Sequence, residues 1–228
     1  MKAVQTRMPP LTRGPRLYRG YLSGGQQAQL LAALREVFAA APLFTPRMPK
    51  SGRPFTVRMS NCGPPDWVSD EHGYRYQPLH PDTRRPWPPM PPAMLAIWSE
   101  LARYPAPPEA CLINYYRPSA KMGLHQDRDE TDFDAPVVSI SLGDSCLFRV
   151  GGLKRREPTQ PSVWTRVMRS SSAARPASLS TASIVSMPGT SRLLPEGGRI
   201  NLTLRRVTRG ACAGSCRPPA AEAPHDEQ

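Results

Sequence analysis

His125 and Asp127 are the residues of this chain best suited to hold a metal ion. They stand two apart in the run "LHQDRDE" (124–130). Because successive side chains of an extended strand point to opposite faces, an imidazole and a carboxylate two apart share one face. Such a pair suits a divalent first-row metal, and a second histidine would complete the two-histidine, one-carboxylate triad of non-haem iron oxygenases. Taken alone, a His-x-Asp pair is also common in ordinary surface loops.

Short strand-like runs from position 111 onward surround this pair and must position it. They read "CLINYY", "PVVSISLG", "CLFRVGG" and "RINLTLRRV", and they are separated by Gly, Pro or Asp. β-Branched or alternating runs of this length are typical of antiparallel strands. We therefore expect a mainly β protein built as a sandwich or jelly roll.

Two helices are expected before these strands. The first, "LSGGQQAQLLAALREVFAAAP", ends at Pro42 and places a set of apolar residues on one face: Leu30, Leu31, Leu34, Val37 and Phe38. The second, "PPAMLAIWSELARYP" (91–105), begins on prolines suited to a first turn and carries Leu95, Trp98 and Leu101. Between the helices, residues 45–90 are rich in Pro, Gly and aromatic residues, which favours loops and short hairpins of the kind that form lids.

The chain is strongly basic. It has 228 residues, with 30 Lys and Arg against 18 Asp and Glu, so its net charge is +12. A chain of this length can bury one sizeable core, and a positive surplus favours polyanions such as nucleic acids. The alternative is that a GC-rich genome enriches Arg, Ala and Pro without any functional cause.

The cysteines and the chain ends indicate a soluble, cytoplasmic protein. Five cysteines form neither a zinc pattern nor a dense disulfide framework: Cys62, Cys111, Cys146, Cys212 and Cys216. The N-terminal residues lack the apolar core of a signal peptide, and no apolar run approaches the roughly 20 residues that span a bilayer. Residues 208–228, rich in Ala, Pro and charge, are expected to be a disordered tail.

Several ordered motifs together resemble the AlkB family of nucleic-acid alkylation-repair dioxygenases. They are "NYYRPSAKMGLHQDRDE", "PVVSISLGDSCLFRVGGLKRREP" and "PEGGRINLTLRR", and "NCGPPDWVSDEHGYRY" is similar to the nucleotide-recognition lid of that family. The resemblance covers residues 14–160 and 188–207. It implies a mainly β fold with flanking helices, a double-stranded β-helix (jelly roll) of the 2-oxoglutarate/Fe(II) dioxygenase type.

The resemblance also implies how the chain is divided. The implied parts are an N-terminal extension with a buttressing helix (1–44), a nucleotide-recognition lid (45–90), a jelly-roll catalytic core (91–207, with 161–187 atypical) and the tail (208–228).

The resemblance assigns metal and cosubstrate roles to individual residues. His125 and Asp127 match two of the family's Fe(II) ligands, and Arg199 matches the arginine that holds the distal carboxylate of 2-oxoglutarate. A guanidinium fork suits this role because it donates two charge-assisted hydrogen bonds to a carboxylate and stays charged. Further implied cosubstrate contacts are Asn114, Tyr115, Tyr116, Asn201, Thr203 and Arg205. The alternative is routine hydrogen bonding between strands.

The resemblance assigns substrate contacts to the lid and to the loops near the metal pair. They are Trp67, Tyr74, Arg75, Tyr76, Asp129 and Arg155. A damaged base must leave the duplex stack to be reached, and an aromatic platform replaces the stacking that it loses. Methylation of a ring nitrogen adds positive charge, so Asp129 and an electron-rich ring would favour the lesion. The alternative for Trp67 and the tyrosines is hydrophobic packing within a loop.

The reaction implied is oxidative dealkylation of N-alkylated bases, of the 1-methyladenine or 3-methylcytosine type, in DNA or RNA. It uses Fe(II), 2-oxoglutarate and O₂ and releases succinate, CO₂ and an aldehyde. The implied substrate is single-stranded or presents a flipped base, and we expect a monomer that does not bind membranes. A rival interpretation is an oxygenase of related fold that acts on a protein or a small molecule, against which the aromatic lid and the positive charge argue.

A second iron-binding histidine is missing from the sequence. After His125 the next histidine is His225, in the tail, and residues 161–187 are a Ser-, Arg- and Ala-rich stretch with little strand periodicity beyond "ASIVSM". Shifted by one reading frame, this stretch can encode family-like runs with a histidine spanning Ser180 and Thr181. Our hypothesis is a pair of compensating frameshifts. The alternative is a catalytically impaired, nucleic-acid-binding homologue.

Overall fold

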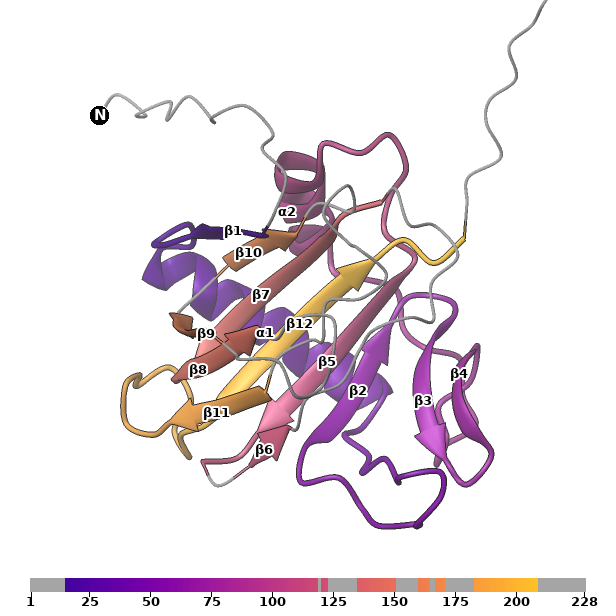
Figure 1. The fold of residues 1–228 in the computed structure, drawn as a ribbon. Helices are drawn as coiled ribbons and strands as arrows, with labels where there is room; N and C mark the ends of the chain where they lie inside the picture. Colours follow the sequence, from indigo (N-terminus) through magenta and orange to yellow (C-terminus); the bar gives the residue numbers. More distant parts are fainter. Residues whose placement is uncertain are drawn as a thin grey trace, which may run out of the picture.

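The computed structural model describes residues 15–118, 120–122, 135–150, 160–164, 167–170 and 183–208, and it is mainly β (Figure 1). The two helices are α1 (Gly24–Ala40) and α2 (Pro92–Ala102). The strands are β1 (Pro15–Tyr18), β2 (Arg58–Cys62), β3 (Asp66–Asp70), β4 (Gly73–Gln77), β5 (Ala110–Tyr116), β6 (Lys121–Met122), β7 (Val137–Gly143), β8 (Ser145–Val150), β9 (Gln160–Trp164), β10 (Val167–Ser170), β11 (Ser183–Met187) and β12 (Arg199–Arg205).

The strands form two main antiparallel sheets and a separate hairpin. Among the described strands, the larger sheet has the order β1-β10-β7-β12-β5-β2, the smaller one has the order β6-β11-β8-β9, and β3 pairs with β4. Figure 1 shows the smaller sheet as a second layer in front of the larger one, while the β3–β4 hairpin lies beyond β2 at the sheet edge. Each of the four strand-like runs expected after position 111 forms a strand, namely β5, β7, β8 and β12.

Strand β12 lies at the centre of the larger sheet, between β5 and β7. Its residue Asn201 is opposite Asn114 of β5 and Ser141 of β7. Because side chains alternate along each strand, this register gives the sheet two chemically different faces. On one face, Leu202 and Leu204 join Ile113 in an apolar cluster.

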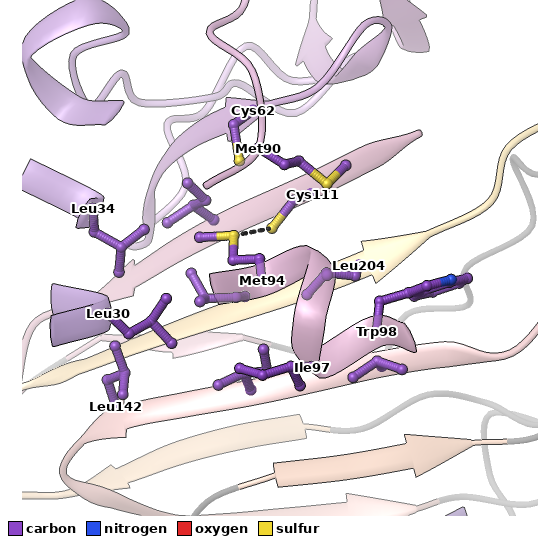
Figure 2. Close-up of a cluster of buried hydrophobic side chains, with 14 of the residues drawn as sticks. Leu30, Leu34, Cys62, Met90, Met94, Ile97, Trp98, Cys111, Leu142 and Leu204 are labelled. Carbon is purple, nitrogen blue, oxygen red and sulfur yellow. Dashed lines mark hydrogen bonds between the residues drawn. The ribbon is translucent and has the colours of Figure 1, made fainter. Parts of the chain in front are cut away.

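Both helices cover this apolar face (Figure 2). Leu30 and Leu34 of α1, and Met94 and Trp98 of α2, are buried in the cluster. The two expected helices are therefore confirmed in position, although Leu95 of α2 is 39% exposed and lies off the buried stripe. In the described residues, neither helix is long and apolar enough to cross a membrane.

Two segments contain strands that their composition did not suggest. Strand β2 lies within residues 45–90, yet it pairs with β5 as part of the larger sheet. Strands β9 and β10 lie in or at the border of residues 161–187, and they pair with β8 and β7 respectively. Backbone hydrogen bonds hold a strand in a ladder whatever its side chains, so weak periodicity does not exclude a strand.

Candidate active site

The face of the larger sheet turned away from the helices is polar at its centre. Neighbouring strands contribute alternating residues that lie opposite one another in the register. We call this set the polar inner face: Asn114 and Tyr116 of β5, Ser139 and Ser141 of β7, and Arg199, Asn201, Thr203 and Arg205 of β12. All but Ser139 are buried. Sequence reasoning selected most of this set but missed both serines, although polar residues alternate with apolar ones in "SISLG".

Arg199 is the most unusual member of the polar inner face, because its cation is 1% exposed. Its Nη2 donates to the Ser141 hydroxyl, and its Nη1 donates to the backbone oxygen of Asp144 at 3.4 Å. Among the described residues, Nε has no hydrogen-bond partner and no carboxylate forms an ion pair with the guanidinium. A buried cation with an unused donor is expensive unless an anion joins it.

The side-chain amides of Asn201 and Asn114 differ in how many of their hydrogen bonds are made within the described residues. Asn201 Nδ2 donates to Ser139 Oγ at 2.8 Å, and Thr203 Oγ1 donates to Asn201 Oδ1 at 3.2 Å. The amide of Asn114 lies directly across from Asn201, and its Oδ1 is buried without a hydrogen-bond partner in the described part of the chain. The unused polar capacity at Asn114 and Arg199 therefore lies on the same face of adjacent strands.

The two tyrosines of β5 lie on opposite faces of the sheet. Tyr116 is fully buried on the polar inner face, where its hydroxyl lies 3.6 Å from the sulfur of Met122. Tyr115 packs instead against the apolar cluster on the helix side. The expected cosubstrate contact of Tyr115 is therefore not supported, because the strand alternation that brings Asn114 and Tyr116 to one face turns Tyr115 to the other.

A buried carboxylate from the turn after β7 fixes the backbone that leads into Arg199. Asp144 Oδ2 accepts from the N–H of Gly198 at 2.9 Å, and Oδ1 accepts from the N–H of Ser191 at 3.0 Å. Gly198 has a φ of +91°, and a Cβ there would lie 2.5 Å from the backbone oxygen of Tyr116, so no larger residue fits. Asp144 thus holds the start of β12 in place. The sequence alone gave no sign of this role.

A second buried carboxylate, Asp66, lies at the start of β3. Its Oδ1 accepts from the N–H of Trp67 at 2.8 Å, and its Oδ2 accepts from the N–H of Cys111 at 2.9 Å. Burial raises the pKa of Asp66 to about 8, although the backbone N–H groups of Trp67, Cys111 and Cys62 and the charge of Arg205 act in the opposite direction. Asp66 therefore links the hairpin to the end of the polar inner face that carries Arg205.

The β3–β4 hairpin carries the aromatic residues expected to bind a base. Trp67 is opposite Tyr76 in the register and Ser69 is opposite Tyr74, so all three aromatic side chains belong to one face of the hairpin. The rings of Trp67 and Tyr74 are stacked, with centroids 5.5 Å apart and an interplanar angle of 18°. Tyr74 is 50% exposed, whereas Trp67 is partly buried against the core.

Arg75 lies on the other face of the hairpin and has a partner there. Its Nη1 and Nη2 each donate to the carboxylate of Asp70 at 2.7 Å, and its Nε donates to Gln77 Oε1 at 3.1 Å. The guanidinium holds the pKa of Asp70 at about 2. The expected substrate contact of Arg75 is therefore not supported, because its fork is engaged by Asp70 and alternation turns it away from the aromatic face.

The remaining expected site residues lie outside the described residues. They are the metal ligands His125 and Asp127 and the substrate contacts Asp129 and Arg155. Within the ranges that the structure describes, no three His, Cys, Asp or Glu side chains gather as a metal site.

Comparison with known proteins identifies the family of this chain. A family model for the 2OG-Fe(II) oxygenase superfamily matches residues 14–205. An alpha-ketoglutarate-dependent dioxygenase AlkB homolog of Caulobacter vibrioides (strain NA1000 / CB15N) is 44% identical over 210 residues, which cover 90% of this chain and 94% of the relative. The chain belongs to the AlkB family of this superfamily. AlkB of Escherichia coli (strain K12) is 40% identical over 153 residues, which cover 65% of this chain and 70% of that protein.

A solved structure shows the same fold at a larger sequence distance. The structure of OsALKBH1 matches 87% of this chain and 100% of its own, with a TM-score of 0.71 and 23% identity. Together with the two antiparallel sheets, this match confirms the jelly roll expected from the sequence.

The residues of the polar inner face fit the 2-oxoglutarate that the AlkB family implies. Among the described residues Arg199 has no anionic partner, so a dicarboxylate would supply one and its Nε would gain an acceptor. The unpartnered atom of Asn114 on the same face is its acceptor Oδ1, so Asn114 can donate to a carboxylate when its amide is turned to present Nδ2. For Fe(II), the sequence offers the imidazole of His125 and the carboxylate of Asp127, but no second histidine between them and His225. The donor set for iron is therefore incomplete by one ligand.

Proposed function

We propose that this chain catalyses oxidative dealkylation of N-alkylated bases, of the 1-methyladenine or 3-methylcytosine type, in DNA or RNA. It would do so as a monomer in the cytoplasm on single-stranded substrate or on a base flipped from the duplex. The relatives that carry the names AlkB and nucleic acid dioxygenase ALKBH1 support a nucleic-acid substrate. The net charge of +12 favours the same partner.

The observation that carries this proposal is the unused Nε donor of the buried Arg199. A cation that is 1% exposed, with no ion-pair partner in the described residues, needs a bound anion. Ser141 and the backbone oxygen of Asp144 orient the guanidinium, and the Nε edge of the fork, which has no partner in the described part of the chain, can donate to a carboxylate. We assign that carboxylate to 2-oxoglutarate.

The side chains of this chain position the reactants. Arg199 and Asn114 bind and orient the cosubstrate, while the buried surroundings of Tyr116 exclude water from it. When bound by His125 and Asp127, Fe(II) supplies the oxidation chemistry with O₂. Trp67 and Tyr76 offer aromatic faces for the base, and Tyr74 covers one side of the Trp67 ring until the base arrives.

The test is turnover by the purified chain. Single-stranded DNA with one 1-methyladenine is incubated with Fe(II), 2-oxoglutarate and O₂, and restored adenine and succinate are counted by mass spectrometry. We expect one succinate for each restored base. The variant Arg199→Met should lose both products, whereas the exposed Arg35→Met on α1 should keep them. Products that persist without 2-oxoglutarate would refute the proposal.

A second candidate function is nucleic-acid binding without turnover. It is favoured by the missing histidine, because two protein ligands hold Fe(II) more weakly than three. A titration with Fe(II) separates the candidates. Saturable iron binding with product formation supports the dealkylase, while tight binding of methylated DNA with no succinate at any iron concentration supports the binding homologue.

A further inference from the structure

Two buried polar side chains converge on the backbone of a single lid residue, Trp67. The N–H of Trp67 donates to Asp66 Oδ1, and its carbonyl oxygen accepts from Asn61 Nδ2, both at 2.8 Å. Asp66 and Asn61 are each 0% exposed. Burying polar side chains is costly unless their hydrogen bonds are made, so these two contacts constrain both peptide units that flank the Cα of Trp67. The second polar atom of Asn61, Oδ1, is buried without a hydrogen-bond partner in the described residues.

Both side chains are in turn fixed by the larger sheet. Asp66 Oδ2 accepts from the N–H of Cys111 in β5 at 2.9 Å. Asn61 belongs to β2, where it lies opposite Leu112 of β5 in the register. These two side chains therefore tie the hairpin to the sheet edge at Trp67, whereas the ladder of β3 joins it to β4 within the hairpin.

A further contact supports this attachment two residues along β3. Ser69 Oγ donates to the backbone oxygen of Arg47 at 2.7 Å, and the N–H of Arg47 donates to the Ser69 oxygen at 3.1 Å. By contrast, Tyr74 on the outer strand β4 is 50% exposed. One ring of the aromatic pair is thus held by the core and the other lies at the surface.

We propose that Asp66 and Asn61 are positioning residues that set the plane of the Trp67 ring for the substrate base. This inference rests on the proposed function, in which Trp67 stacks on the base. Fixing both the N–H and the carbonyl of Trp67 fixes its peptide planes and hence the direction of its side chain. A ring ordered in advance loses less freedom when the base binds, so the fixed backbone strengthens stacking without touching the base.

The experiment measures binding without turnover. The dissociation constant is determined by fluorescence anisotropy for a single-stranded oligonucleotide with one 1-methyladenine and for the same oligonucleotide unmodified. The variants are Asp66→Ala, Asp66→Asn and Asn61→Leu, and the matched control is the exposed Asp82→Asn. We expect Asp66→Ala and Asn61→Leu to weaken binding of the methylated oligonucleotide roughly tenfold. Asp66→Asn should be intermediate, because it keeps one of the two acceptor oxygens.

A structural role alone would not change the preference for the methylated base. We therefore expect Asn61→Leu to lower the preference for the methylated oligonucleotide, measured as the dissociation constant of the unmodified oligonucleotide divided by that of the methylated one. The affinity for 2-oxoglutarate should stay within about twofold, since β2, which carries Asn61, is separated from β12 and its Arg199 by β5. Hydrogen exchange of the Trp67 amide gives a second readout, which we expect to be protected in the wild type and faster in Asp66→Asn. If Asp66→Ala does not fold, Asp66→Asn and Asn61→Leu carry the test.

The outcomes distinguish this proposal from the proposed function. A wild-type chain that binds both oligonucleotides equally would count against the proposed function, while protection of the Trp67 amide would still report on the contacts of Asp66. A wild-type preference for the methylated oligonucleotide that survives in both Asn61→Leu and Asp66→Asn would overturn the positioning role.

Discussion

Replacing Arg199 with methionine should separate the stability of this protein from its capacity to bind 2-oxoglutarate. The guanidinium is 1% exposed, makes two hydrogen bonds through Nη1 and Nη2, and has no carboxylate partner among the described residues. Desolvation of a buried charge costs several kcal/mol, so exchanging Arg199 for an apolar side chain of similar length removes that cost together with two hydrogen bonds of about 1 kcal/mol each. We therefore expect the ligand-free Arg199→Met variant to unfold at the wild-type temperature or above.

With 2-oxoglutarate present, the wild type should instead unfold at the higher temperature of the two proteins. Two charge-assisted hydrogen bonds of roughly 1.5–3 kcal/mol each correspond to at least a 100-fold change in affinity, so the variant should hardly bind 2-oxoglutarate. For the wild type, 2-oxoglutarate at about 100 times its Kd stabilises the fold by about 2.7 kcal/mol. In a chain of this size that amounts to an increase in Tm of roughly 5–11 °C.

The assay is thermal unfolding with and without 2-oxoglutarate, in the presence of Fe(II) and under nitrogen so that no turnover occurs. Wild type and the exposed control Arg35→Met should show the full increase in Tm, and Arg199→Met should show none. If Arg199→Met retained the wild-type increase, the assignment of the carboxylate to Arg199 would be wrong. A large loss of stability in the ligand-free variant would instead refute the view that this cation is uncompensated.

Three further outcomes follow from single side chains. Leu34 is 0% exposed beneath the larger sheet, so Leu34→Ala should lower the free energy of unfolding by about 2–5 kcal/mol in a urea titration, and a loss under about 1 kcal/mol would contradict its place in the core. The folded pKa of Asp66, about 8, lies above the ordinary aspartate value of 3.8, so the stability that it contributes is complete below pH 4 and is lost as pH rises toward 8. The Tm of Asp66→Asn relative to wild type should therefore increase from pH 5 to pH 8, and a constant difference would show that Asp66 is ionised throughout. Because Arg75 is engaged by Asp70 at the surface, Arg75→Ala should change stability by less than about 1 kcal/mol and should weaken binding of methylated DNA less than threefold, whereas a tenfold loss in the binding assay would restore its expected substrate contact.

The strands of the jelly roll could be read from the sequence because their side chains alternate. In "RINLTLR" (199–205) the polar residues stand at every second position, and the structure turns all four to one face opposite the apolar cluster. The same alternation turns Tyr115, predicted from the motif to contact the cosubstrate, to the helix side of the sheet. A motif marks a stretch of residues, but only the strand geometry decides which of two neighbours faces the site.

Other features depend on contacts between distant parts of the chain, which sequence patterns do not reveal. Asp66 follows two prolines and resembles an ordinary turn residue, yet its partner Cys111 lies 45 residues away. Asp144 likewise accepts from Gly198, 54 residues away. Strand β2 was read as part of a loop-rich lid because its neighbours are Pro- and Gly-rich, and its pairing with β5 decides its conformation.

A crystal structure of this chain grown with 2-oxoglutarate tests the central claim most directly. We expect one carboxylate of the ligand within hydrogen-bond distance of the Nε of Arg199, with the amide of Asn114 in contact with the same molecule. Density for 2-oxoglutarate elsewhere, or a protein carboxylate paired with Arg199 in its place, would contradict the site proposed for this chain.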